Sequence, residues 1–354
     1  MKNKYLPVYL ILFTVTAAIF SACGMKHVAI NTMRPAEINV PQHVDTLLLL
    51  NRTQFKSQAG NILEGILTGE MPGEDKAGTQ AAMSTLQENL SYTGRYYVKN
   101  AEEVLNGNSI SAAFPDALDW DLIGDLCEKY NTNGVLAIEI FDTDFIVTNG
   151  KRKAKKEVTE NGVKKTIEVD EYYAEGIANI TVGFRLYDPK TKTIVDQNLM
   201  TRSNTWNAAG NSVQEAVAQL VVKTEATRYV SKLAGEAYAY KISPMPVRLS
   251  REFYGKSKRV DLVKVGTRQA EVNDWVNALE TWKKAFKQAK EDKDKGRIAY
   301  NIAIAYEVLS DLENAKLWCK ISYVDFGNKK ARQYANILDQ RSYDLEVLKQ
   351  QLGE

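Results

Sequence analysis

Few residue types that perform catalysis occur in this chain of 354 residues. It contains two histidines, His27 and His43, and three cysteines. Both histidines lie close to the N-terminus, so a histidine-dependent nucleophilic triad or a histidine-rich metal site is not expected. The chain also lacks a glycine-rich loop of the P-loop or dinucleotide-binding type. We therefore expect no enzyme activity, no cofactor and no metal site.

Two groups of carboxylates remain as candidates for acid–base or cation-binding chemistry. Asp142 and Asp144 follow an apolar run and could ligate a cation. The weakest hypothesis is that they serve a hydrolase that uses carboxylates alone. The second group surrounds an expected helix start and comprises Asp116, Asp119, Asp121 and Asp125. Because the helix dipole stabilises carboxylates at a helix N-terminus, we interpret this group as capping residues.

The segment before Cys23 has the pattern of a secretory signal. Lys2 and Lys4 precede an apolar run of 16 residues, Tyr5–Phe20, and small residues precede Cys23. About 20 apolar residues are needed to span a bilayer as a helix. The pattern therefore predicts a signal peptide at residues 1–22 that is removed, rather than a permanent transmembrane anchor.

The sequence Phe20-Ser21-Ala22-Cys23 resembles the lipobox of bacterial lipoproteins. In that family the cysteine thiol receives a diacylglycerol, the signal is cut just before it, and the new N-terminus is acylated. Phe20 departs from the leucine that the family prefers at this position. The resemblance implies a membrane anchor at Cys23, and Gly24, in place of the aspartate of inner-membrane retention, favours the outer membrane with the chain facing the periplasm. An ordinary signal peptide with an incidental cysteine is the alternative.

The chain without its signal peptide has no net charge. The formal net charge is +2, and Lys2 and Lys4 account for all of it. A neutral protein does not attract phosphate backbones, so we expect no nucleic acid partner. Cys127 and Cys319 fall on apolar faces of expected helices, where a lone cysteine behaves as a small hydrophobic residue. No disulfide framework is expected, although one bridge between them stays open.

The elements that must position these residues form two domains behind a tether. Residues 23–43 contain two prolines and no periodicity, which is typical of a lipidated tether. Residues 44–245 are expected to form an α/β domain with a mixed sheet, helices and a protruding charged hairpin. Residues 247–354 are expected to be all helical. The break at Ser243-Pro244-Met245-Pro246 marks the boundary.

Apolar patterning within residues 44–245 predicts an alternation of strands and helices. Apolar runs predict buried strands at 46–50 and 135–141, and strict alternation predicts a half-exposed strand at 180–187. Expected helices lie at 55–66, 82–90, 118–130 and, after the capping box Ser212-Val213-Gln214-Glu215, at 212–237. Asn161-Gly162, inside the charged segment 151–170, predicts a hairpin.

This order of elements resembles the periplasmic domain shared by the curli-secretion lipoprotein, the translocation protein of the Tol system and lipoprotein activators of penicillin-binding proteins. The resemblance rests on Thr46–Asn51, Asp121–Phe141, the turn at Tyr187-Asp188-Pro189 and the closing helix. It raises the alternative of a secretion-pore subunit. Most residues of Lys151–Glu160 are charged, however, and such an arm cannot face hydrocarbon. We expect a solvated protrusion here, with a docking arm as the alternative.

The C-terminal region resembles tetratricopeptide repeats. Small and large residues recur at the spacing that lets two antiparallel helices pack closely, and they comprise Gly266, Ala278, Trp282, Ala285, Tyr306 and Ala315. The pattern departs from the family at Cys319 and Ser322, and Lys290 and Gly327 stand where proline is usual. Two repeats and a capping helix are fewer than a stable stack usually needs.

A tetratricopeptide stack usually binds its partner in the groove lined by the first helix of each repeat. By repeat spacing, the lining would comprise Glu271, Arg297, Tyr300, Ile304 and Glu307. The alternative is that these are ordinary surface residues. The sequence as a whole favours an outer-membrane lipoprotein that acts as an adaptor or assembly factor through protein partners in the cell envelope. It names neither the partner nor the oligomeric state.

Overall fold

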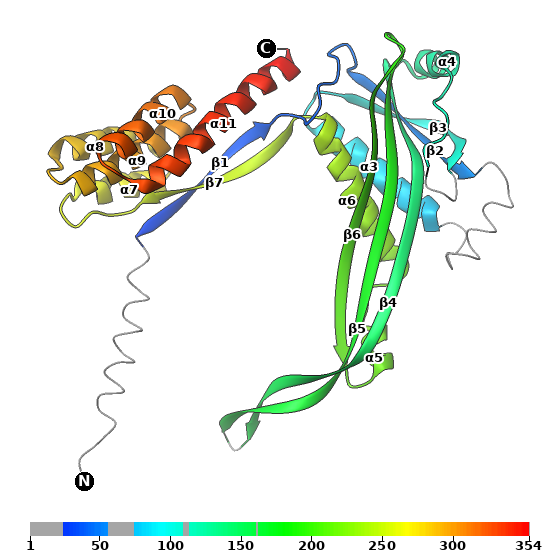
Figure 1. Ribbon diagram of the computed structural model, residues 1–354, viewed down its shortest axis with the longest axis horizontal. Helices are drawn as coiled ribbons and strands as arrows, with labels where there is room; N and C mark the ends of the chain where they lie inside the picture. The colour runs from blue at the N-terminus through cyan, green and yellow to red at the C-terminus, as the bar shows by residue number, and fades with distance from the viewer. Residues whose placement is uncertain (1–23, 56–73, 109–112, 161, 354) are drawn as a thin grey trace. The chain divides into compact units, whose positions relative to one another are not determined.

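The computed structural model describes residues 24–55, 74–108, 113–160 and 162–353, which form two compact units (Figure 1). The sheet unit runs from residue 36 to 245 and includes the last residues of the chain. The helical unit combines residues 246–350 with the N-terminal segment up to residue 35. The predicted fold class, a mixed sheet with helices followed by an all-helical region, is confirmed.

Three sequence predictions concern parts of the chain outside these residues. The signal peptide and Cys23 lie before residue 24, and the helix expected at 55–66 lies almost entirely within 56–73. In the part of the chain that is described, no helix combines the length and the apolar character needed to cross a bilayer.

The sheet has five strands in the order β3-β2-β4-β5-β6. Their bounds are β2 Thr46–Phe55, β3 Tyr97–Asn108, β4 Gly134–Glu160, β5 Val163–Asp188 and β6 Thr193–Gly210. Strand β2 pairs in parallel with β3 and β4, whereas β4, β5 and β6 are antiparallel. Strands β4 and β5 continue together well beyond the end of β2 and form the long hairpin visible in Figure 1.

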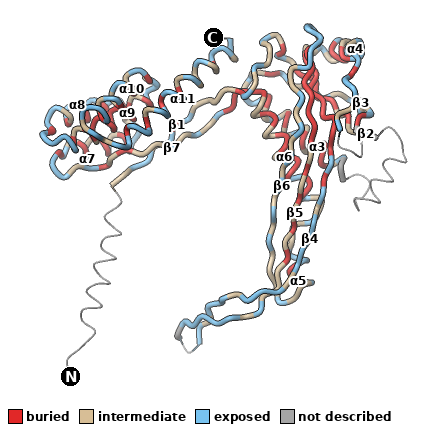
Figure 2. Tube along the Cα trace, in the orientation of Figure 1, coloured by how far each residue is buried: buried red, intermediate tan, exposed pale blue. Residues whose placement is uncertain are grey.

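Helices cover both faces of the sheet where β2 lies in it. Helices α3 (Glu74–Tyr92) and α6 (Lys223–Ile242) pack on one face, and α4 (Trp120–Tyr130) packs on the other. Leu47 and Leu49 belong to the first core, while Leu48 and Leu50 belong to the second. Because successive strand side chains point to opposite faces, this double cover explains the uninterrupted apolar run of β2. Figure 2 shows the buried residues gathered around these strands.

The charged hairpin predicted at 151–170 is present as the outer part of β4 and β5. Its residues are exposed or half-buried, and Figure 2 shows this end of the hairpin almost free of buried positions. Cross-strand ion pairs join Lys151 to Asp170 at 2.8 Å and Arg152 to Glu171 at 2.6 Å. Charged side chains therefore hold the two arms in register where no core is available.

The single helix predicted over 212–237 is wrong, although Ser212 caps a helix start as predicted. The Ser212 hydroxyl accepts a hydrogen bond from the Glu215 backbone at 3.2 Å. The helix it caps, α5, ends after six residues (Val213–Ala218), and α6 begins only at Lys223. Val222 adopts an extended backbone between them, a conformation that β-branched residues favour.

The helical unit is a succession of helices, of which α7, α8, α9 and α10 each pack on the next. They are α7 (Leu262–Glu271), α8 (Trp275–Gln288), α9 (Asp292–Val308), α10 (Leu312–Lys320) and α11 (Lys329–Leu352), with one π-helical turn, η2 (Ile321–Asp325), after α10. Of the predicted packing residues, Ala278, Trp282, Ala285 and Ala315 have no exposed surface, and Tyr306 is half-buried. A Cβ at Gly266 would lie 2.5 Å from Nε1 of Trp282, which explains the glycine. The tetratricopeptide assignment itself stays a prediction.

The tether predicted at 23–43 is wrong for Met25–Arg34, which forms strand β1. Strand β1 pairs with β7 (Met245–Tyr254) in a two-stranded sheet, and the Gly255 backbone donates to the Gly24 carbonyl at 2.8 Å. Val28 packs against the core of the helical unit. The apolar residues of β1 do not alternate strictly, so its strand character depends on a partner more than 200 residues away in the chain.

Candidate functional site

The carboxylates singled out in the sequence lie in two separate places, at the start of α4 and on β4. The Asp119 side chain accepts a hydrogen bond from the Asp121 backbone at 2.8 Å and caps α4, as predicted. Asp142 and Asp144 are exposed on the same face of β4. Partial burial and the nearby Asp144 raise the pKa of Asp142. Among the described residues, no group of three or more histidine, cysteine, aspartate or glutamate side chains could hold a metal ion.

His43 and Asp188 form a pair that sequence reasoning did not anticipate. Nε2 of His43 lies 3.0 Å from both carboxylate oxygens of Asp188. The Thr191 hydroxyl donates to the same carboxylate at 2.7 Å, and the Lys190 backbone donates at 3.0 Å. Burial opposes ionisation of Asp188, but the hydrogen bonds from His43 and Thr191 outweigh it and lower its pKa. The pair thus stabilises the turn between β5 and β6, which is a structural role.

A buried ionic cluster connects the strands on the α4 side of the sheet. Glu139 is fully buried at a bulge in β4, and Arg52 and Arg185 pair with it at 3.0 and 2.7 Å. The Tyr187 hydroxyl donates to Glu139 at 2.7 Å, and Arg185 also donates to Gln197 of β6. The cluster brings together charges from β2, β4 and β5, and Gln197 connects it to β6. Since the two arginines and Tyr187 all engage Glu139, we interpret it as a structural connection.

The predicted partner groove is wrong for three of its five residues. Tyr300, Ile304 and Glu307 are buried. Arg251 of β7 holds Glu307 through two bonds of 2.8 and 2.9 Å, and the Tyr334 hydroxyl of α11 donates to it at 2.5 Å. The groove face of α9 is therefore occupied by β7 and α11 of the same unit. Repeat spacing alone could not reveal these two elements.

The other two predicted groove residues, Arg297 and Glu271, lie closer to the surface. Arg297 is half-buried with its guanidinium 5.0 Å from the ring centre of Tyr254. Glu271 is exposed and forms an ion pair of 2.7 Å with Lys26 of β1. The structure therefore does not bring the five residues together as one open surface.

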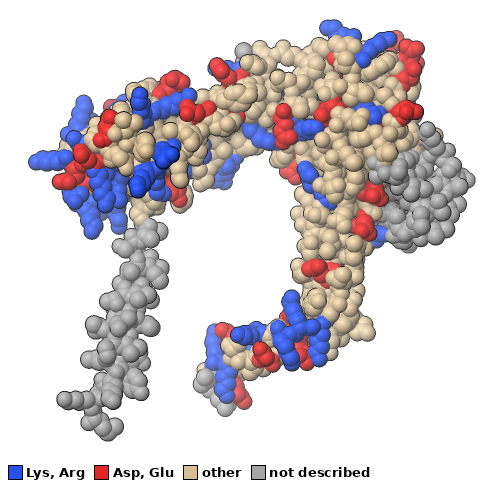
Figure 3. Space-filling view, viewed as in Figure 1, with Lys and Arg blue, Asp and Glu red and all other residues tan. Residues whose placement is uncertain are grey.

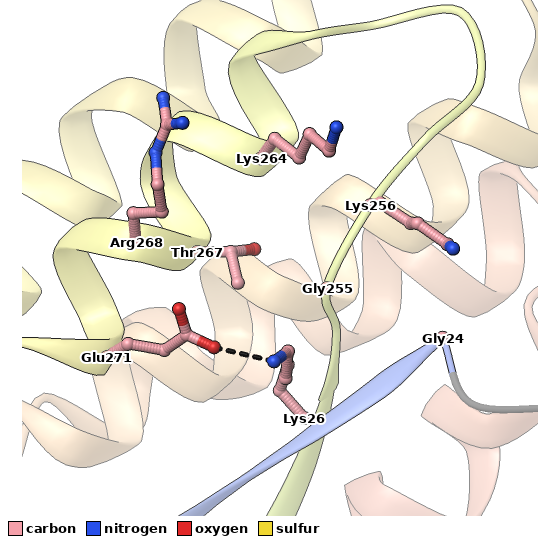
Figure 4. Close-up of a pocket in the computed structure, with 8 residues that line it drawn as sticks. All are labelled: Gly24, Lys26, Gly255, Lys256, Lys264, Thr267, Arg268 and Glu271. Carbon is pink, nitrogen blue, oxygen red and sulfur yellow. Dashed lines mark ion pairs between the residues drawn. The ribbon is translucent and has the colours of Figure 1, made fainter.

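Glu271 instead lines an open, basic pocket of about 320 Å³ in the helical unit. The lining comprises Gly24, Lys26, Gly255, Lys256, Lys264, Thr267, Arg268 and Glu271. Figure 4 shows that the cations come from three places: Lys26 from β1, Lys256 from the loop after β7, and Lys264 with Arg268 from α7. The lining thus contains four cations and one carboxylate, Glu271, which pairs with Lys26. No ion pair joins Lys256, Lys264 or Arg268 to an acid of the described chain.

The outer edge of β6 is the second surface that could bind a partner. Strand β6 pairs with β5 without interruption from Asp196 to Gly210, and in the described part of the chain no strand pairs with its other side. Figure 1 shows β6 as the outermost strand of its side of the sheet. Between Gln197 and Gly210 the only charged residue is Arg202, and there is no proline. Such an edge lacks the devices that usually prevent pairing with another strand.

Sequence reasoning missed both surfaces for the same reason. The pocket forms because β1 lies beside α7, and β6 has a free edge in the described sheet because it is the last strand in its order. Neither arrangement can be read from local sequence patterns. A charge count for each domain, however, would have shown that the positive charge is concentrated in the C-terminal region.

Two family models match the chain. Residues 44–254 match a domain of unknown function, DUF8603, and residues 264–343 match a second domain of unknown function, DUF6340. No curated protein matches the chain significantly.

Several solved structures of bacterial proteins are distantly similar. The PelC dodecamer from Paraburkholderia phytofirmans is 11% identical, with 61% of this chain and 98% of that chain covered and a TM-score of 0.26. A minor lipoprotein from Acinetobacter baumannii is 10% identical, with 55% and 90% covered and a TM-score of 0.23. A putative neuraminyllactose-binding hemagglutinin homolog from Helicobacter pylori is 12% identical, with 59% and 90% covered and a TM-score of 0.28. No function transfers across similarities of this size.

Proposed function

The chain belongs to the family described as a domain of unknown function, DUF8603, and for this member we propose a non-enzymatic role in the bacterial cell envelope. It is an outer-membrane lipoprotein, anchored through Cys23 and facing the periplasm. It acts as an adaptor or assembly factor that binds an extended segment of a partner protein along the edge of β6.

The open edge of β6 is the observation that carries this proposal. Backbone donors and acceptors along an unpaired edge can bind an added strand, and alternate side chains then set the specificity. The exposed residues of this part of β6 include Thr201, Ser203, Thr205 and Asn207, which are small or uncharged. An uncharged extended segment therefore suits the edge better than a strongly charged one.

The buried charges of the described residues are engaged by other side chains, which supports a structural rather than a chemical use of them. The buried charges Glu139 and Glu307 are each paired with two arginines. The charged arms of the β4–β5 hairpin carry no apolar band, so the pore alternative has no support from this hairpin. Exposed Asp142 and Asp144 lie on an open sheet face, which gives a hydrolase no enclosed site.

The anchor is tested by labelling cells with a radioactive or clickable palmitate. We expect wild-type protein to incorporate the label and to sediment with the outer membrane. Cys23→Ser should incorporate none, because it lacks the thiol that accepts the diacylglycerol. Cys127→Ala is the matched control, since that thiol is buried, and it should be labelled like wild type. Unlabelled wild-type protein would overturn the lipoprotein assignment.

The edge is tested by placing a photo-crosslinking amino acid at Thr201 and comparing two double variants. Ser203→Lys with Thr205→Lys puts two charges beside the edge, and lysine there disfavours added strands. We expect it to abolish the adduct that forms in the wild-type background. Ser84→Lys with Ser91→Lys adds the same charge at exposed positions of α3 and should leave the adduct unchanged.

Three outcomes of the edge experiment contradict the proposal. Adducts that persist in the β6 variant would exclude the edge, and equal loss in both variants would indicate a general charge effect. An adduct with a second copy of this chain would identify self-assembly in place of an adaptor role.

A further inference from the structure

The charges of this protein are divided unequally between its two units. Residues 24–35 and 246–350 contain 23 lysines and arginines against 15 aspartates and glutamates, a net charge of +8. Residues 36–245 and 351–354 contain 21 against 29, a net charge of −8. Figure 3 shows lysine and arginine side chains crowded over the helical unit. The zero net charge of the mature chain is therefore the sum of two large opposite charges.

The basic pocket lies directly beside the position proposed to carry the lipid. Gly24 is the residue after Cys23, and it lines the pocket. The hydrogen bond from the Gly255 backbone to the Gly24 carbonyl, 2.8 Å long, holds it there. An acylated Cys23 would enter the membrane interface one residue away. The inference that follows therefore rests on the proposed acylation for its setting.

The chemistry of the pocket suits a small anion. Lys264 and Arg268 are one turn apart on α7, where like charges repel each other. Lys26 is engaged by Glu271, which leaves the pocket with three further cations and no second carboxylate in its lining. A phosphate group would neutralise these cations and accept several charge-assisted hydrogen bonds at once. The Thr267 backbone and hydroxyl lie in the same lining, although that hydroxyl donates to the Val263 carbonyl.

We propose that this pocket binds the headgroup phosphate of an anionic phospholipid in the leaflet that holds the acyl anchor. The protein thus contacts the membrane at two points, through the acyl chains at Cys23 and through a phosphate in the pocket. The second contact fixes which side of the helical unit faces the lipid surface.

A membrane lipid is a better source of this phosphate than a free solute. Exposed lysines and arginines bind a single soluble anion weakly, because water and salt screen them. An anionic leaflet instead presents many headgroups side by side, so that the pocket and the basic surface around it can bind several phosphates at once even without the anchor. Surface cations also add their attractions to an anionic leaflet.

The proposal is tested on the unacylated chain from residue 23 with Cys23→Ser, by co-sedimentation with vesicles. We expect binding to vesicles of phosphatidylcholine mixed with phosphatidylglycerol and not to phosphatidylcholine alone. Lys264→Gln with Arg268→Gln should weaken this binding about tenfold or more, because two attractive charges are lost. Lys155→Gln with Lys156→Gln removes the same charge from the exposed hairpin and should leave binding unchanged.

The outcomes separate this proposal from the lipoprotein assignment. Palmitate labelling of the full-length chain decides acylation, whereas the vesicle experiment uses a chain that cannot be acylated. Equal weakening in the two double variants, or no preference for anionic vesicles, would overturn the pocket proposal alone. Inorganic phosphate at constant ionic strength should compete with the vesicles at concentrations where chloride does not, because the pocket is proposed to hold a phosphate group. Equal competition by the two anions would overturn the phosphate site.

Discussion

Glu307 shows how one side chain can determine the structure around it. The carboxylate is fully buried in α9 and is held by Arg251 of β7 and by Arg341 and Tyr334 of α11. Burial of a charge is costly, and ion pairs and hydrogen bonds with suitable geometry offset that cost. The sequence pattern predicts a partner-binding role for this position, whereas the structure uses it to connect three elements of the helical unit.

Glu307→Gln is expected to destabilise the helical unit by about 3 kcal/mol or more, because it leaves two buried arginines without a negative charge. The free energy of unfolding is measured by urea denaturation followed by tryptophan fluorescence, since Trp275, Trp282 and Trp318 all belong to this unit. Glu313→Gln is the matched control. Its side chain is 88% exposed, so a change within about 0.5 kcal/mol is expected. Similar losses in the two variants would contradict the structural role of Glu307.

Burial also explains why Cys127 and Cys319 behave as predicted from the sequence. Both are free and buried. Burial raises the pKa of the Cys319 thiol to about 12, and its sulfur donates to the Ala331 carbonyl at 3.0 Å. Cys319 is therefore a small apolar residue of the helical core rather than a reactive thiol.

Secondary structure was predictable from the sequence where an element has its own pattern of buried apolar residues. It was not predictable where an element forms only because it pairs with a segment far away in the chain. Strand β2 and helix α4 have clear apolar patterns and appear as expected. Strand β1 has no such pattern, because β7 and the helical core make it a strand. The candidate sites follow the same rule. Capping at Asp119 is local and predictable, whereas the basic pocket depends on residues separated by most of the chain.

The outer hairpin of β4 and β5 is an element without a core of its own, so it can be shortened without loss of stability. Removal of Lys153–Glu160 and Val163–Asp170 would leave Arg152 and Glu171, which are paired in the sheet, joined by Asn161-Gly162. We expect a change in the free energy of unfolding within about 0.5 kcal/mol, because the deletion removes only exposed ion pairs and the strand pairing of the arm itself. Urea denaturation measures this change.

The same shortened chain distinguishes a solvated protrusion from a docking arm. If the photo-adduct at Thr201 persists, the hairpin is a protrusion with no part in partner binding. If the adduct disappears while the unfolding free energy is unchanged, the hairpin is an arm that the partner contacts.

Over the whole molecule, the net charge of zero conceals a positive helical unit and a negative sheet unit. A helical unit of +8 attracts anionic surfaces, and a sheet unit of −8 is repelled by them. The zero net charge of the mature chain is therefore weaker evidence against a nucleic acid partner than the sequence alone suggests. The proposed lipid anchor and the basic pocket belong to the same positive unit, which favours a membrane over other polyanions.

The pairing of β1 with β7 also determines the order in which the protein can mature. During synthesis β1 finds its partner only after Met245 has been made, and the helical core on which it packs follows later still. The sheet unit can therefore fold first, while β1 is still an unpaired strand that can aggregate. If Cys23 is acylated as proposed, the anchored end would keep the unpaired β1 away from other copies of the chain until synthesis is complete.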